Sequence, residues 1–214
     1  MTAYVVDENV PIVANDSSRP EPKAQQADVD CRLACVQALN RVVRTGIIII
    51  DIEDEVVQAY RKYLDFRGQP GAGDAFYRHV LDNKYNRKRV RRIKVMRTAD
   101  RRLEALPAAL SDFDPADQIF VVLALVATEG PRILNAVDSD YSQHKAALES
   151  AGVRVEELCP WCLKGARAKD ATETIGRARS SALNGRSAGR SRGRPRCSSS
   201  AERGHSRSTD AQDP

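Results

Sequence analysis

The sequence contains no stretch of about 18 apolar residues, the length that a membrane-spanning helix needs, so we expect no transmembrane helix. The N-terminus has no basic region followed by a hydrophobic segment, and we therefore predict no secretory signal. The chain has 5 cysteines, an odd number, which without a signal favours reduced thiols over a disulfide framework. Together these absences predict a cytoplasmic protein.

Nucleotide-binding motifs are also absent. Residues 68–73 are rich in Gly but lack the Lys-Ser/Thr pair of a P-loop and the third Gly of a dinucleotide fingerprint. We interpret them as a turn before a helix. The three histidines, His79, His144 and His205, have no metal-ligand spacing, and the chain has no internal repeat.

The net positive charge of the chain lies at its C-terminal end. Residues 166–214 hold eleven Lys or Arg against five Asp or Glu, whereas the whole chain has a net charge of +5. This segment has too few large apolar side chains to offset its ordering entropy, so we predict a folded domain at 1–165 and a disordered basic tail at 166–214. Such a tail attracts phosphate backbones without reading sequence. An extension that only aids solubility is the alternative, and composition leaves both open.

Short apolar runs alternate with segments of helical periodicity in residues 1–165. The run of four Ile residues closed by Asp51 is the strongest indication of a buried strand. Alternation of this kind predicts an α/β fold with crossover units and a mostly parallel sheet. We expect strands at 3–7, 47–51, within 84–102, at 132–137 and at 153–158, and helices at 28–43, 53–66, 74–82, 115–128 and 141–151.

Acidic residues stand at the ends of three buried elements. Asp7 closes the first strand and is followed by Asn9, Asp117 begins an apolar helix, and Asp138 and Asp140 follow a late strand. Open α/β sheets place ligand sites at the carboxyl ends of their strands. If the acids converge, they form a site for Mg²⁺ or Mn²⁺, which take oxygen ligands. Taken singly, each acid is also explained as a helix-terminal, turn or loop residue.

The order and spacing of these acids over about residues 3–160 resemble the PIN domain family. The resemblance implies a three-layer α/β/α sandwich with a mostly parallel central sheet, and a nuclease that cleaves single-stranded RNA with Mg²⁺ or Mn²⁺. Many family members are bacterial toxins paired with antitoxins, so a toxin-type role and an antitoxin partner are candidates here. The resemblance assigns Asp7, Asp117 and Asp138 as catalytic metal-binding acids and Asp140 as a further acid, and implies that Asn9 steadies Asp7.

The sequence departs from the family pattern at Ala59, where the resemblance leads us to expect Glu. Glu55 lies one helical turn earlier on the same face. It is a candidate metal ligand through a bridging water, or a solvated surface acid. The departure puts full activity in doubt and leaves the fold expectation unchanged.

Three hypotheses follow. The first is a metal-dependent endoribonuclease, and the second is a catalytically weakened PIN-like module that binds nucleic acid. The basic run 84–92, which includes Tyr85, suits a nucleic-acid groove or a solvated loop. The third is a metal phosphatase, which usually needs Asp-x-Asp at the first strand end; this chain has Asp7-Glu8-Asn9 there.

Four cysteines form two closely spaced pairs. Cys31 and Cys35 are four residues apart on a predicted helix, and Cys159 and Cys162 form a CxxC at the end of the domain. The four are a candidate structural zinc site if the two segments meet in the fold. Buried cysteines that pack as small hydrophobes are the alternative.

Overall fold

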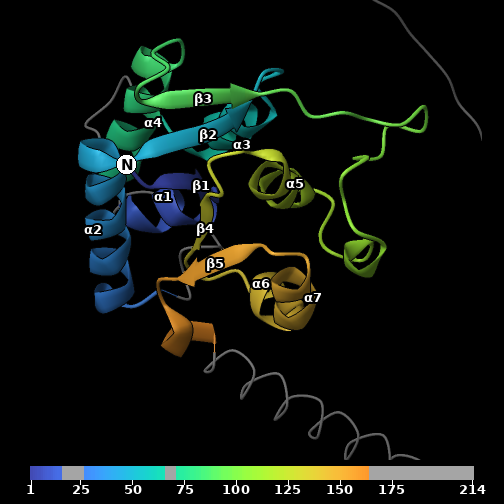
Figure 1. Ribbon diagram of the computed structural model, residues 1–214. Coiled ribbons are helices and arrows are strands. Elements are labelled where there is room, and N and C mark those ends of the chain that lie inside the picture. Colours follow the sequence, from blue (N-terminus) through green and yellow to red (C-terminus); the bar gives the residue numbers. More distant parts are fainter. Residues whose placement is uncertain (16–26, 66–70, 164–214) are drawn as a thin grey trace, which may run out of the picture. The chain divides into compact units, whose positions relative to one another are not determined.

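The computed structural model describes residues 1–15, 27–65 and 71–163 (Figure 1). The first half of the Gly-rich turn at 68–73 lies outside these residues, and the predicted basic tail lies wholly outside them. Within the described part of the chain, no helix is both long and apolar enough to cross a lipid bilayer.

A five-stranded sheet forms the centre of the fold, and its strands are all parallel. The spatial order β3-β2-β1-β4-β5 puts the first strand in the middle, so the chain builds one side of the sheet before returning to the other. This confirms the predicted α/β class with a parallel sheet. The strands are β1 (Ala3–Val6), β2 (Ile47–Asp51), β3 (Val90–Ile93), β4 (Arg132–Asn135) and β5 (Arg154–Glu157).

Helices cover both faces of the sheet, an arrangement consistent with a three-layer sandwich. The helices α1, α2 and α4 pack on one another and form one outer layer, whereas α3 and α5 pack together against the other face (Figure 1). The inner strands β1, β2 and β4 are mostly apolar, as expected of strands covered on both faces. The helices are α1 (Asn9–Ala14), α2 (Val29–Thr45), α3 (Glu55–Tyr63), α4 (Ala72–Asn83), α5 (Gln118–Val126), α6 (Asp140–Gln143) and α7 (Lys145–Ser150), with a 3₁₀ turn η2 (Ala108–Leu110).

The short helix α1 has no counterpart in the sequence-based expectations. Its six residues are too few to show helical periodicity, and Pro11 reads as a breaker although the first turn of a helix tolerates it. Helix α4 packs closely on it: a Cβ added to Gly73 would lie 1.9 Å from the Pro11 carbonyl oxygen. This close approach requires glycine and brings α4 directly against the helix that follows the first strand.

The cysteines correct one expectation. Cys31 at the start of α2 and Cys159 just after β5 form a disulfide, so the expectation of reduced thiols is wrong for this pair. An odd cysteine count requires only that one thiol stays out of a disulfide. The partners are 128 residues apart in the sequence, and only the folded chain brings them together. Cys35 and Cys162 are free thiols.

Candidate metal centre

The candidate site lies where the order of the strands reverses. The chain continues from β1 to β2 on one side and later returns to place β4 on the other side of β1. The carboxyl ends of β1 and β4 therefore flank the crevice in which open α/β sheets bind ligands. Asp7 and Glu8 leave β1 at this point, and Asn135 ends β4. Helix α5, which begins beside Asp117, packs across β1, β2 and β4.

A hydrogen-bond network fixes Asp7 in place. Its Oδ1 accepts from the Asn9 backbone N–H at 2.9 Å and from Asn9 Nδ2 at 2.5 Å, and its Oδ2 accepts from the Tyr141 hydroxyl at 2.7 Å. Asn9 also donates to Asn135 Oδ1 at 3.0 Å and accepts from the Ala136 backbone N–H at 2.8 Å, which ties the end of β1 to the end of β4. The implied role of Asn9 in steadying Asp7 is confirmed by these contacts.

Three acids meet in the interior. The carboxylates of Asp7, Glu8 and Asp117 each offer an oxygen, these oxygens lie within 4.8 Å of one another, and all three residues are buried. Burial, and then the charge of Glu8, raise the pKa of Asp7 well above its ordinary range, although the hydrogen bonds from Asn9 and Tyr141 oppose the rise. Crowded carboxylates of this kind favour a bound cation, which relieves their repulsion.

The donor set fits a small divalent ion. Two oxygens bonded to one Mg²⁺ at about 2.1 Å lie roughly 3.0–4.2 Å apart, close to the upper limit of 4.8 Å for this group. All three donors are carboxylate oxygens, the ligand type that Mg²⁺ and Mn²⁺ prefer. Asp117 precedes α5 but makes no capping hydrogen bond from its side chain, so a purely helix-capping role does not account for its burial.

Asp138 lies near this group but is not one of the three acids within the 4.8 Å limit, judged over the described residues. Its negative charge contributes to the raised pKa of Asp7. Its carbonyl oxygen accepts from Asn135 Nδ2 at 2.8 Å, and its Oδ1 accepts from the Asp140 backbone N–H at 2.9 Å. Asp140 in turn accepts from the Asp114 backbone N–H at 3.3 Å. Metal ligation by Asp138 and Asp140 stays a prediction.

Glu55 has a cationic partner. Arg97 donates from Nη2 to both of its carboxylate oxygens, at 2.8 and 2.6 Å. Glu55 and Ala59 line the same cleft as Glu8. Ligation by Glu55 stays a prediction, and an ion would have to compete with Arg97 for it.

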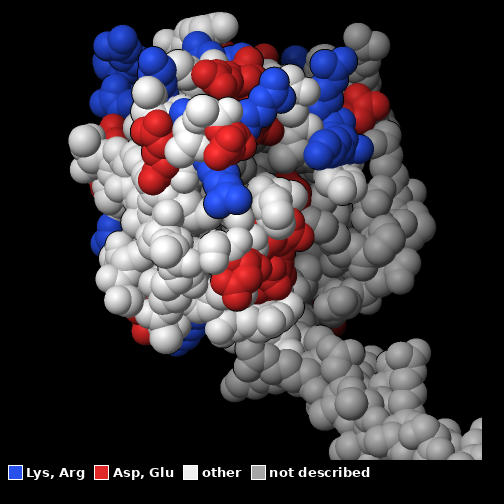
Figure 2. Space-filling view, turned by 90° about the vertical axis from the view of Figure 1, so that its right-hand side faces the viewer, with Lys and Arg blue, Asp and Glu red and all other residues white. Residues whose placement is uncertain are grey.

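The cleft connects the buried acids to the surface. Its volume is about 1180 Å³, and Glu8 lines it together with the residues on either side of Asp117. Glu8 therefore belongs both to the buried acidic group and to the cleft wall. The basic side chains that line the cleft are Lys62, Arg97, Arg101 and Arg102. Figure 2 shows basic side chains mainly over the upper part of this face of the molecule, with acidic side chains among and below them.

The basic run at 84–92 forms a second, smaller hollow of about 600 Å³. Tyr85 is 78% exposed there, with Lys84 and Arg92 against its ring. Part of the positive charge is neutralised, because Lys84 and Arg92 both pair with Asp54. An exposed ring flanked by cations suits base stacking, but the ion pairs also explain these side chains as surface structure.

Sequence reasoning assigned no role to two residues of the site, Glu8 and Tyr141. Glu8 immediately follows Asp7 and precedes an apolar stretch, so an acid beside a candidate ligand inside a buried segment was the available signal. Tyr141 follows Asp140 in the sequence, and nothing local indicates that its hydroxyl reaches back to Asp7. Comparison of the chain with protein-family models, curated proteins and solved structures gave no significant match.

Proposed function

We propose that the protein is a Mg²⁺- or Mn²⁺-dependent endoribonuclease that cleaves single-stranded RNA on a PIN-like fold. The observation that carries the proposal is the buried group of Asp7, Glu8 and Asp117 at the reversal point of the sheet, opening through Glu8 into a cleft with basic walls. Carboxylates alone repel a phosphate, so a site built from them needs a cation to act on one. The basic walls suit the phosphate backbone.

In this proposal, one set of residues binds the ion and another binds the RNA. Asp7, Glu8 and Asp117 would hold the ion, which when bound supplies a water of lowered pKa and neutralises charge that develops on the phosphate. Asn9 and Tyr141 keep the Asp7 carboxylate in one orientation. The exposed Arg101 and Arg102 line the cleft and would attract the phosphate backbone of the RNA.

The test is cleavage of a fluorescently labelled single-stranded RNA by the purified full-length chain. We expect cleavage with Mg²⁺ or Mn²⁺, none in EDTA, and loss of cleavage in Asp7→Asn. Glu53→Gln is the matched control, because Glu53 is an exposed acid in the wall of the same cleft and outside the buried group. Cleavage that persists in Asp7→Asn, or that needs no metal, contradicts the proposal.

A second candidate function is binding of RNA without cleavage. The observations that favour it are Ala59 in place of a carboxylate and the engagement of Glu55 by Arg97. Under this alternative the wild type retains RNA but leaves it intact with either metal, and Arg101→Ala with Arg102→Ala weakens retention. If the Ala59→Glu variant cleaves RNA although the wild type does not, the site is a weakened nuclease centre.

Some parts of the proposal rest on the PIN resemblance alone. These are the toxin-type role and the antitoxin partner. The basic tail adds a sequence-independent attraction for RNA in this proposal, on composition only. Capture of RNA at low salt by the full chain, compared with a chain ending at Gly165, separates the contribution of the tail from that of the cleft.

A further inference from the structure

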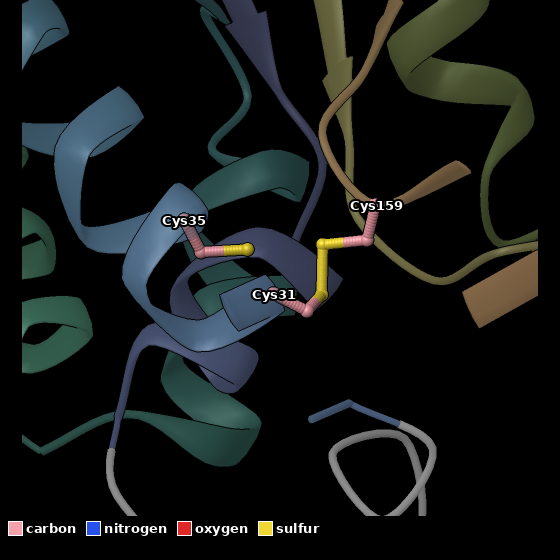
Figure 3. A group of neighbouring side chains, drawn as sticks. All are labelled: Cys31, Cys35 and Cys159. Carbon is pink, nitrogen blue, oxygen red and sulfur yellow. A yellow bond between two sulfur atoms is a disulfide. The ribbon is translucent and has the colours of Figure 1, made fainter. Parts of the chain in front are cut away.

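A second cluster of metal-binding side chains lies on the opposite side of the sheet from the cleft. The sulfurs of Cys31, Cys35 and Cys159 are buried and lie within 4.8 Å of one another. Figure 3 shows Cys31 and Cys35 projecting from α2, with the Cys35 sulfur directed toward the Cys31–Cys159 disulfide. The disulfide accounts for the sulfurs of Cys31 and Cys159 but not for the position of the Cys35 sulfur beside them.

A fourth sulfur belongs to the same neighbourhood. Cys162 follows Cys159 in a tight turn in which its backbone N–H donates to the Cys159 carbonyl oxygen at 3.0 Å. The Cys31–Cys159 disulfide thus brings together two short-spaced cysteine pairs, one on a helix and one in a turn, from segments far apart in the sequence.

We propose that the four cysteines Cys31, Cys35, Cys159 and Cys162 form a structural zinc site in the reduced protein, and that the Cys31–Cys159 disulfide is its metal-free oxidised state. A tetrahedral ion with Zn–S bonds of about 2.3 Å places its sulfurs about 3.8 Å apart. The three sulfurs lie within 4.8 Å of one another, and the bonded sulfurs of Cys31 and Cys159 would separate to this spacing once the disulfide is reduced. Cys162 lies outside the three-sulfur group in the disulfide form, so its half-buried side chain would have to move to supply the fourth ligand.

Besides the disulfide, the side chain of Asp28 joins the two halves of the cluster. Asp28 caps α2 by accepting from the Cys31 backbone N–H at 2.8 Å, and its other oxygen accepts from Trp161 Nε1 at 3.0 Å. Trp161 stands between the two cysteines of the CxxC. The same carboxylate therefore holds both halves of the cluster together, so cleaving the S–S bond leaves the thiols near one another. The helix N-terminus also favours thiolate ligands at Cys31.

The conversion balances with a dithiol reductant. The reductant gives two electrons and two protons to the S–S bond and becomes a disulfide itself, which leaves four thiols in the cluster. Binding of Zn²⁺ then forms four Zn–S bonds and releases four protons to solvent. In a reducing compartment the metal-bound form is the expected one, because intracellular dithiols keep cysteines reduced.

The experiment titrates the full-length chain with Co²⁺ and then Zn²⁺, after reduction with an excess of a phosphine and removal of metal. Cys197 is replaced by Ser in every sample, so that the remaining thiols are the four of the cluster. We expect one Co²⁺ per chain with thiolate-to-cobalt charge-transfer absorption, displaced by one equivalent of Zn²⁺. Trp161 is the only Trp in the chain, and its fluorescence should change at the same equivalence point.

Two variants test the ligand set. Cys35→Ser leaves the cysteines of the disulfide intact, so the oxidised variant reports whether the fold survives. Cys162→Ser alters a half-buried side chain at the domain end, where the risk to folding is low. Loss of partners that merely orient a metal ligand costs about 10–100-fold in affinity, so loss of a ligand should cost at least tenfold. No thiolate-to-cobalt absorption in the reduced protein, or unchanged affinity in both variants, overturns the proposal.

Discussion

Replacement of Asp7 by Asn should stabilise the metal-free protein. The carboxyl of Asp7 has a raised pKa because it is buried and lies beside Glu8. The Asn side chain retains the hydrogen-bond pattern: its oxygen accepts from Asn9, and its amide donates to the Tyr141 hydroxyl, which can turn to accept. The substitution therefore removes one buried negative charge while the surrounding contacts persist.

The magnitude follows from proton linkage. A carboxyl with a higher pKa in the folded than in the unfolded state retains its proton in the folded protein after the unfolded chain has released it. The free energy of unfolding therefore falls as pH rises from about 3.8, the ordinary value for an Asp carboxyl, up to the folded-state pKa. The slope reaches at most about 1.4 kcal/mol per pH unit. For a chain of this size, each kcal/mol corresponds to about 2–4 °C in melting temperature.

The assay is thermal unfolding of the full-length chain in EDTA between pH 4 and 8. The wild type should lose stability with rising pH, and Asp7→Asn should flatten the loss and melt higher at neutral pH. With Mn²⁺ at 100 times its Kd, the wild type should gain about 2.7 kcal/mol and Asp7→Asn almost nothing. Asp100→Asn, an exposed acid, serves as the control. An Asp7→Asn protein that melts lower than the wild type at pH 8 in EDTA refutes the reasoning.

Three other substitutions test the surroundings. Tyr141→Phe removes the hydrogen bond to Asp7 and should lower the free energy of unfolding by about 1.5–3 kcal/mol when that carboxyl is ionised. Urea unfolding should therefore show a larger loss of stability at pH 8 than at pH 5. An equal loss at both pH values would contradict this. Gly73→Ala forces a methyl group against the Pro11 carbonyl oxygen and should lower the free energy of unfolding by about 1–3 kcal/mol, as measured by urea unfolding. An unchanged free energy of unfolding would show that α4 can move away from α1 without loss of stability. Ala59→Glu adds a carboxylate to the cleft and should tighten Mn²⁺ binding severalfold in calorimetry, whereas weaker binding would place residue 59 away from the ion.

Much of the fold could be predicted from local sequence patterns. The four-Ile run strongly indicated a buried strand, and the apolar runs near Tyr4 and Ile133 indicated the neighbouring strands. Helix α2 was predicted at 28–43, and the structure shows that Asp28 caps its first turn. The spatial order of the strands could not be read in this way, since it depends on packing between segments distant in the chain.

The candidate site was only partly predictable for the same reason. Asp7 and Asp117 stand at recognisable ends of buried elements, and the fold brings them together. The contribution of Glu8 depends on how the chain turns into α1, a helix too short to leave a periodic pattern. The pairing of Glu55 with Arg97 links residues from a helix and a loop, and no local signal indicates such a partner.

The central claim is that Asp7, Glu8 and Asp117 together hold one divalent ion. The most direct measurement is a crystal structure of the full-length protein soaked in Mn²⁺, with anomalous scattering used to locate the metal. The account predicts one strong anomalous peak within about 2.0–2.6 Å of oxygens from all three carboxylates, lost in crystals of Asp7→Asn. No peak at this position, at Mn²⁺ concentrations that saturate known carboxylate sites, would contradict it.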